Sequence, residues 1–176
     1  MAPDPAVVVG DELEVAVAAF AYDGALRRVL SRLKYGGGAR LAEPLAECSA
    51  PILHPFLEDH RDAVLVPVPV HVERLRQRGY NQAALLARRL APWVGLPTAD
   101  LLARLRPTSQ QHRLNRAQRL RNLRGAFALR AGARAPPRVV LVDDILTTSA
   151  TLEACAGVLR AAGAERVVGV AIAREI

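Results

Sequence analysis

The run Arg138-Val-Val-Leu-Val-Asp-Asp-Ile-Leu-Thr-Thr-Ser-Ala-Thr151 decides the fold. Its apolar half predicts a buried strand that ends at the carboxylates Asp143 and Asp144. A helix over Thr151–Ala161, closed by Gly163, and a second apolar strand over Arg166–Ala173 are expected next. Strand, helix and strand within about 35 residues form a βαβ unit, and continuous apolar strands indicate a parallel sheet covered on both faces. The fold class is therefore α/β.

The rest of the chain fits one domain built around this unit. We expect a tail over residues 1–12 and a single domain over 13–176, with a small N-terminal hood region beside a mainly parallel sheet flanked by helices. The other expected elements are a strand over Leu13–Tyr22, a helix from Asp23 to the Gly36–Gly38 run, a helix over Arg40–Ser49 ending at Pro51, a strand over Val64–Val66, a helix over Gln82–Leu90 ending before Pro92, and a loop with an arginine-rich helix over 104–124. Pro67 and Pro69 favour an edge position for the strand that precedes them.

The charge of the chain is positive and unevenly distributed. The net charge is +7 with a pI of about 10.6, and Lys34 is the only lysine, so arginine supplies nearly all the positive charge. Between Arg74 and Val142 the only acidic residue is Asp100. This pattern indicates an anionic partner, either a polyphosphate ligand, a nucleic acid, or both. The alternative is a proteome-wide enrichment in arginine.

Several classes of protein are disfavoured. The two cysteines, Cys48 and Cys155, are far apart and form no CxxC motif, so neither a structural zinc site nor a disulfide framework is expected. The first residues do not resemble a signal peptide, and no apolar run reaches membrane-spanning length. We therefore expect a cytoplasmic protein without membrane insertion.

The residues after the central strand suggest a binding site for a phosphorylated sugar. Small and hydroxyl side chains follow Asp143 and Asp144 where a helix begins, and free N–H groups at a helix N-terminus bind anions. The two carboxylates fit a role as acceptors for sugar hydroxyls. The alternatives are a simple turn with Thr151 as a helix cap, or a response-regulator acid pocket. The latter needs a lysine late in the chain, whereas this chain has only Lys34.

The segment Val139–Thr151 resembles the 5-phosphoribosyl-1-pyrophosphate (PRPP) motif of type I phosphoribosyltransferases, which implies that fold. By this resemblance Asp143 and Asp144 are the catalytic residues, and Mg²⁺ is the cofactor. The metal is brought by PRPP, with these two acids as its candidate protein ligands. The implied PRPP-binding set is Asp143, Asp144, Ile145, Leu146, Thr147, Thr148, Ser149, Ala150 and Thr151. The family usually has glycine at Ser149, so an unusual backbone angle there would strain the serine.

Four further motifs resemble the ComF family, phosphoribosyltransferase-like proteins linked to natural competence. They are Lys34-Tyr-Gly-Gly, Val66-Pro-Val-Pro-Val-His, Arg74-x-Arg-x-Arg-Gly-Tyr-Asn-Gln, and Thr108-x-Gln-x-x-x-Leu-x-x-x-x-Arg-x-x-Asn-Leu-Arg-Gly-Ala-Phe. The match runs from about Ala18 to Arg174. Many members carry an N-terminal zinc ribbon with four cysteines, and we expect this chain to lack it.

Pyrophosphate donors are expected in two loops. The alternation of Arg74, Arg76 and Arg78 predicts an extended segment that presents them on one side. Residues 106–122 resemble the mobile loop of glutamine-PRPP amidotransferase, which implies that Gln111, Arg113, Arg119 and Asn122 close over the ligand. The alternative for the arginines is a solvated basic face.

Four other side chains receive weaker interpretations. His71 is interpreted as structural. Lys34 either contacts phosphate or caps a helix. Tyr35 and Tyr80 either stack on a base or pack, and packing is favoured.

Two functions are compatible with these patterns. The first is an enzyme that transfers phosphoribosyl from PRPP to a base with release of pyrophosphate. The second is a non-catalytic PRPP- or nucleotide-sensing protein that binds single-stranded DNA and DNA-uptake proteins. The sequence does not specify the acceptor base, turnover or the oligomeric state, for which a homodimer is one candidate.

Overall fold

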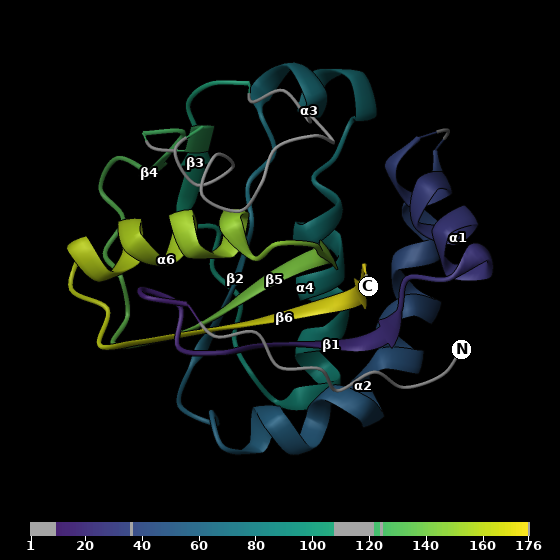
Figure 1. The fold of residues 1–176 in the computed structure, drawn as a ribbon, viewed down its shortest axis with the longest axis horizontal. Coiled ribbons are helices and arrows are strands. Elements are labelled where there is room, and N and C mark those ends of the chain that lie inside the picture. The colour runs from purple at the N-terminus through teal and green to yellow at the C-terminus, as the bar shows by residue number, and fades with distance from the viewer. Residues whose placement is uncertain (1–9, 36, 108–121, 124, 176) are drawn as a thin grey trace.

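A four-stranded parallel sheet forms the centre of the molecule (Figure 1). The computed structural model describes residues 10–35, 37–107, 122–123 and 125–175. The strand order is β1-β6-β5-β2, with bounds Ala16–Ala21, Arg166–Arg174, Arg138–Leu146 and Val64–Pro67. The two longest strands, β5 and β6, lie in the middle, and the proline-containing β2 lies at an edge, as expected. The α/β class and the parallel sheet are confirmed.

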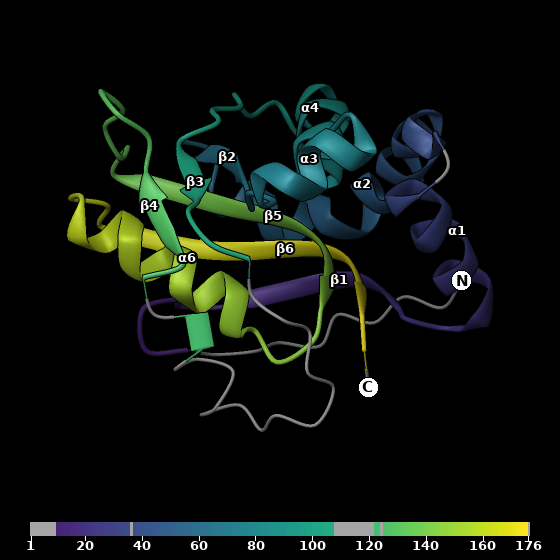
Figure 2. The same cartoon turned by 90° about the horizontal axis from the view of Figure 1, so that it is seen from above.

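Helices cover both faces of the sheet (Figure 2). The helices α2 (Ala42–Glu58) and α4 (Gln82–Val94) pack on one face, and α6 (Ala150–Ala161) packs on the other. Helix α1 (Gly24–Lys34) stands beyond the carboxyl ends of the strands. The remaining elements are the 3₁₀ helix η1 (Gly38–Leu41), the short helix α3 (Val72–Arg78), and an antiparallel hairpin of β3 (Leu102–Arg104) and β4 (Phe127–Leu129).

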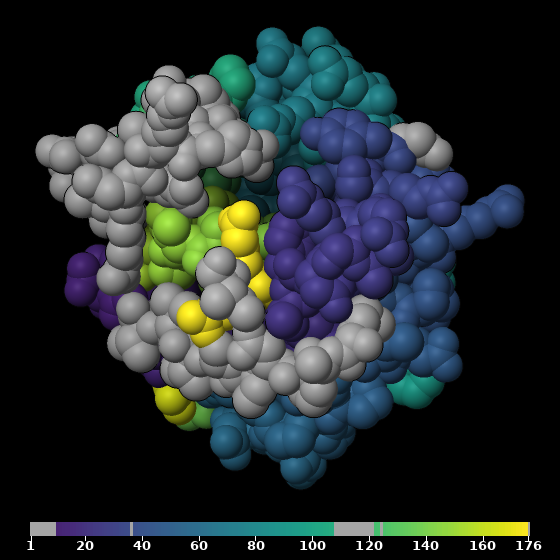
Figure 3. Space-filling view, turned by 45° about the vertical axis from the view of Figure 1, so that its right-hand side comes forward, coloured from purple at the N-terminus to yellow at the C-terminus, as the bar shows by residue number. Residues whose placement is uncertain are grey.

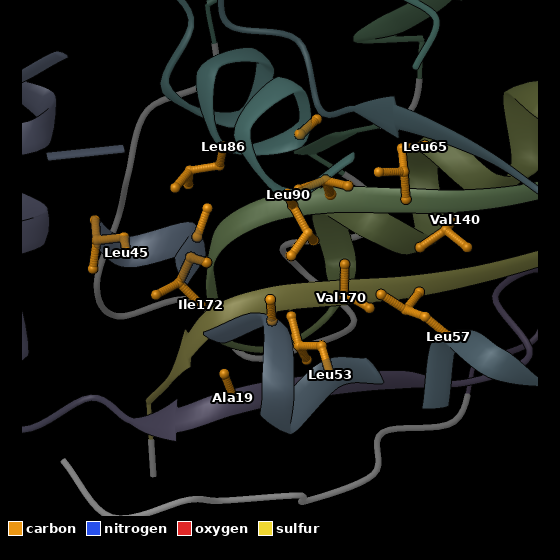
Figure 4. Close-up of a cluster of buried hydrophobic side chains, with 14 of the residues drawn as sticks. Ala19, Leu45, Leu53, Leu57, Leu65, Leu86, Leu90, Val140, Val170 and Ile172 are labelled. Atoms are coloured by element: carbon orange, nitrogen blue, oxygen red, sulfur yellow. The ribbon is translucent and has the colours of Figure 1, made fainter. Parts of the chain in front are cut away.

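The alternation of side chains along β5 builds two apolar cores. Val140 and Val142 belong to the core under α2 and α4, whereas Val139 and Leu141 belong to the core under α6. In the first core, leucines of α2 and α4 meet Val140 and Val170 of the sheet (Figure 4). A strand buried on both faces must be apolar at every position, which explains the unbroken run in the sequence.

Two helices continue through prolines at which the sequence predicts an end. Helix α2 contains Pro51 and Pro55, and α4 contains Pro92. An interior proline costs about 3 kcal/mol because it removes a helical hydrogen bond. In α2 this cost is offset by burial, since Ala50, Leu53 and Leu57 on either side of the prolines all reach the core. The predicted ends at Pro51 and before Pro92 were therefore wrong.

The segment around Arg74 also differs from the prediction, because it forms the helix α3 instead of an extended segment. His71 caps this helix by accepting the Glu73 N–H at 3.4 Å, which agrees with its structural interpretation. Gly79 ends the helix in the left-handed conformation, at φ 81°. In a helix, residues four apart share a face, so Arg74 and Arg78 lie together and Arg76 points elsewhere.

The N-terminal part of the described chain is held by one buried carboxylate. Glu153 of α6 accepts hydrogen bonds from the N–H groups of Asp11, Glu12 and Leu13 at 2.7–3.2 Å. The division into a tail over 1–12 and one domain remains a prediction. No helix among the described residues is long and apolar enough to cross a bilayer.

Candidate functional site

The site begins where β2 ends and β5 continues. β2 pairs with β5 only as far as Pro67 opposite Val142, and Val68 adds one last N–H to the Val142 carbonyl at 2.9 Å. β5 runs on to Leu146, past the end predicted at the two acids, because β6 still pairs with it there. On the side that β2 has left, the carboxylate of Asp143 accepts the Asp144 N–H at 2.8 Å. The edge of β5 that carries both acids is therefore open to a ligand.

The loop after β5 turns sharply into α6 at Ser149. Ser149 is the only described non-glycine residue with positive φ, at 56°, in the left-handed region that favours glycine. Its hydroxyl donates to the neighbouring Thr148 carbonyl at 2.6 Å and does not cap the helix. The first N–H groups of α6 thus face the loop without a side-chain cap from Ser149. The unusual backbone angle anticipated at this serine is present.

A cavity of about 450 Å³ joins these elements. It is visible in Figure 3 as a hollow between α1, in purple to blue, and the light-green segment at the β5–α6 junction. The described charged residues that line it are Arg27, Lys34, Arg74, Arg78, Arg104, Asp143, Asp144 and Glu175. Cations outnumber carboxylates by five to three in this list, so the cavity suits an anion that carries hydroxyl groups.

The two aspartates differ in their surroundings. The Asp144 side chain is 5% exposed, and its Oδ2 lies 2.8 Å from the Lys34 Nζ of α1. Asp143 is half-buried and, unlike Asp144, has no ion pair among the described residues. Burial, and then the adjacent Asp144 carboxylate, raise the pKa of Asp143, while Lys34 opposes this increase. The pair therefore combines one carboxylate with a fixed counter-ion and one that is hard to ionise.

Three arginines form the opposite wall. Arg78 donates to Gln82 at 2.9 Å, and its guanidinium lies 5.0 Å from the centre of the Tyr35 ring. Arg104 comes from β3 and lies 5.3 Å from the Phe127 ring. Burial, and then the nearby Arg74 guanidinium, lower the pKa of Arg104. Neighbouring positive charges of this kind favour the binding of an anion.

Most, but not all, of the predicted site residues meet at the cavity. From the PRPP motif, its lining includes Asp143, Asp144, Ile145, Thr147, Thr148, Ala150 and Thr151. Leu146 and Ser149 are buried and do not line the cavity. Of the first arginine group, Arg74 and Arg78 line the cavity, whereas Arg76 is exposed on another face of α3.

The second predicted loop is described only in part. Gln111, Arg113 and Arg119 lie outside the described residues, and Asn122 lines the cavity.

The two tyrosines have different environments. Tyr80 donates its hydroxyl to the Leu33 carbonyl at 2.7 Å, as packing predicts, but Tyr35 is 64% exposed, so packing is wrong for Tyr35.

Sequence reasoning missed several lining residues. Arg104 belongs to none of the predicted motifs, and it reaches the site through a bridge between β3 and His71, the residue that precedes α3. Arg27 and Ser31 lie four residues apart on α1, a spacing that predicts a shared helix face, and Tyr35 follows directly after the helix ends. Tyr22 and Glu175 arrive from the ends of β1 and β6.

The fold and the acid–hydroxyl loop define an α/β protein of the type I phosphoribosyltransferase type. Competence protein F of Haemophilus influenzae is 38% identical over 106 residues, which are 58% of this chain and 46% of that protein. DNA utilization protein YhgH of Salmonella typhi is 33% identical over 153 residues, 83% of this chain and 66% of that protein. Competence protein ComFC of Streptococcus pneumoniae is 29% identical over 150 residues, 85% of this chain and 64% of that protein.

The chain belongs to the ComF family, because this homology extends over most of its length. It spans between 46% and 66% of the length of these relatives. No protein-family model matches the chain. The names of the relatives associate the family with competence and DNA utilization.

Proposed function

We propose that this chain binds PRPP or a related ribose 5-phosphate ligand together with Mg²⁺. The observation that carries the proposal is the meeting, in one cavity, of a carboxylate pair, a hydroxyl-rich helix N-terminus and a wall of arginines. Each group matches one part of such a ligand. The carboxylates accept the ribose hydroxyls, the loop holds the 5′-phosphate, and the arginines face the pyrophosphate.

The phosphate end is supported by the geometry of α6. Thr147, Thr148, Ala150 and Thr151 line the cavity at the start of this helix of 12 residues. Backbone N–H groups and the positive end of the helix dipole attract an anion, and the small side chain of Ala150 lets it approach. The threonine hydroxyls add donors that a phosphate oxygen accepts.

The sugar end is supported by the carboxylates on the open edge of β5. The Asp144 Oδ2 atom has no well-directed hydrogen-bond donor among the described residues, although the Lys34 ammonium lies beside it. A ribose hydroxyl would supply such a donor. Mg²⁺ would neutralise charge on the pyrophosphate, and Asp143 and Asp144 would be its candidate protein ligands.

We propose further that the site transfers the phosphoribosyl group to a base. A base nitrogen forms the new bond to C1, and the bond from C1 to the pyrophosphate oxygen breaks with its electron pair on pyrophosphate. The nitrogen then loses its proton to solvent. Arg74, Arg78 and Arg104 would stabilise the charge that grows on the leaving group. Holding both reactants in one cavity supplies the orientation.

A second candidate function is non-catalytic sensing of PRPP or a nucleotide coupled to binding of single-stranded DNA. It is favoured by the names of the relatives and by exposed arginines on α1 and α3, among them Arg28, Arg32 and Arg76. Such electrostatic binding weakens steeply with salt. A filter-binding assay that retains no single-stranded DNA at low salt would exclude this function.

Two neighbouring arginines provide a matched test of the ligand site. Arg74→Met removes a cation from the cavity, and Arg76→Met removes an equal charge from the exposed face of the same helix. We expect the first change to weaken Mg²⁺-PRPP binding about tenfold or more and the second to change it less than about twofold, since charge-assisted hydrogen bonds contribute about 1.5–3 kcal/mol. Equal effects of the two changes would indicate that the ligand responds only to the overall positive charge and not to a specific site. Pyrophosphate release from PRPP across a panel of bases tests turnover.

A further inference from the structure

The ion pair between Lys34 and Asp144 occupies the position that the proposed sugar needs. The ammonium lies 2.8 Å from Oδ2, on a side chain that is 20% exposed, while the carboxylate side chain is 5% exposed. Oδ2 has no well-directed hydrogen bond among the described residues, so the charge of Lys34 compensates this buried carboxylate. The contact joins the last residue of α1 to the binding edge of β5, 110 positions further along the chain.

The backbone under Lys34 is fixed, although its side chain is long and flexible. The Leu33 carbonyl accepts a hydrogen bond from the Tyr80 hydroxyl at 2.7 Å, which ties the end of α1 to the segment between α3 and α4. Gly38 packs so closely on this helix end that a Cβ there would collide with the Arg32 carbonyl. The lysine therefore stands on a rigid base, and only its four-carbon side chain needs to rotate for the ammonium to move.

We propose that Lys34 is the resident counter-ion of Asp144 and a specificity-determining residue, which a ligand displaces only if its own phosphates take over the ammonium. This inference rests on the proposed function and deepens it. Both partners line the same cavity as Arg74 and Arg78, so the ammonium moves within one space from carboxylate to phosphate.

Two kinds of competitor are rejected by this arrangement. A neutral riboside has hydroxyls for Asp144 but no anionic oxygen for Lys34, so binding it would leave a partly buried ammonium without compensation. A free divalent cation must displace the ammonium and would meet a like charge beside the carboxylate. A polyphosphate ribose ligand meets neither obstacle.

The single lysine makes the pair observable in the wild-type protein. Reductive methylation with ¹³C-formaldehyde labels Lys34 and the chain's terminal amine, keeps both positively charged, and gives signals that a Lys34→Arg variant assigns. We expect the Lys34 signal of the free protein to differ from that of the Asp144→Asn variant. Identical signals in these two ligand-free samples would overturn the counter-ion assignment, whether or not the protein binds PRPP.

Variants at Lys34 test specificity with a free metal ion as the probe. Mn²⁺ binding is followed by electron paramagnetic resonance without any phosphate ligand. It should strengthen about tenfold or more in Lys34→Met, because the positive charge that competes with the metal ion for Asp144 is removed, and its energetic effect should equal that of a charge-assisted hydrogen bond. Lys34→Arg should retain the wild-type value, and Lys34→Met combined with Asp144→Asn should lose the gain. An unchanged Mn²⁺ affinity in folded Lys34→Met, or in Lys34→Gln if the methionine variant does not fold, would overturn the proposal. If the wild type does not bind PRPP, the proposed function is contradicted, whereas the assignment of Lys34 as the counter-ion of Asp144 is not.

Discussion

Replacing Ser149 by glycine should stabilise the protein relative to alanine at the same position. Ser149 has φ 56° and ψ −4°, and an L residue in this region costs about 1–2 kcal/mol. Glycine removes that cost but adds freedom to the unfolded chain, which offsets about 0.4–1 kcal/mol. Both replacements lose the 2.6 Å hydrogen bond from the serine hydroxyl to Thr148, so this contribution cancels in their comparison. We therefore expect the free energy of unfolding of Ser149→Gly to exceed that of Ser149→Ala by about 0.5–1 kcal/mol.

Equilibrium unfolding in urea measures this difference directly. The two variants are compared at one pH, and equal slopes against urea concentration are required, so that a shift in midpoint reports stability. The alanine variant is the matched control, because it keeps the Cβ atom and removes only the hydroxyl. If the glycine variant is no more stable than the alanine variant, the loop is not strained at this position and the argument from its backbone angle fails.

Three other changes test separate contacts. Glu153→Gln should destabilise the fold by about 1–3 kcal/mol in urea, because the charged acceptor for three N–H groups is lost, of which that of Leu13 is buried and the other two are partly buried. An unchanged midpoint would contradict the anchoring of Asp11 and its neighbours. Tyr80→Phe should cost about 1 kcal/mol through its bond to the Leu33 carbonyl, and no loss in thermal unfolding would show that the bond contributes nothing. Asp143 has a raised pKa, so the folded state binds more protons than the unfolded state once pH exceeds the ordinary carboxyl value, and stability falls as pH rises through that window. Asp143→Asn should remove the contribution of Asp143 to the decrease in unfolding free energy between pH 5 and pH 7.5, which urea unfolding measures. If the unfolding free energy depends on pH equally in the wild type and the variant, this prediction is wrong.

The local parts of the fold are predictable from the sequence. The apolar run before Asp143 is buried on both faces in two cores, so its residue types alone specify a central parallel strand. The hydroxyl-rich stretch that follows leads into α6 within one residue of the predicted start. Each of these features depends on residues that are close together in the sequence, so a local sequence pattern is enough to predict it.

The errors occur where local patterns compete or where contacts are distant. Alternating arginines at 74, 76 and 78 fit an extended segment, but the cap at His71 and the stop at Gly79 decide for a helix. The ion pair of Lys34 with Asp144 joins residues too far apart for any local pattern to record. Arg104 reaches the cavity because β3 bridges to His71, far from it in the sequence. Such contacts follow from tertiary packing.

We infer above all that the carboxylate pair belongs to a site for a ribose phosphate. Calorimetric titration of Mg²⁺-PRPP into the wild-type chain and into the Asp143→Asn, Asp144→Asn double variant is the decisive measurement. We expect saturable binding to the wild type and a loss of about tenfold or more in the folded double variant, since the lost charged contact of Asp144 contributes at least about 1.5 kcal/mol. No binding to the folded wild type, or equal binding to both proteins, would contradict it.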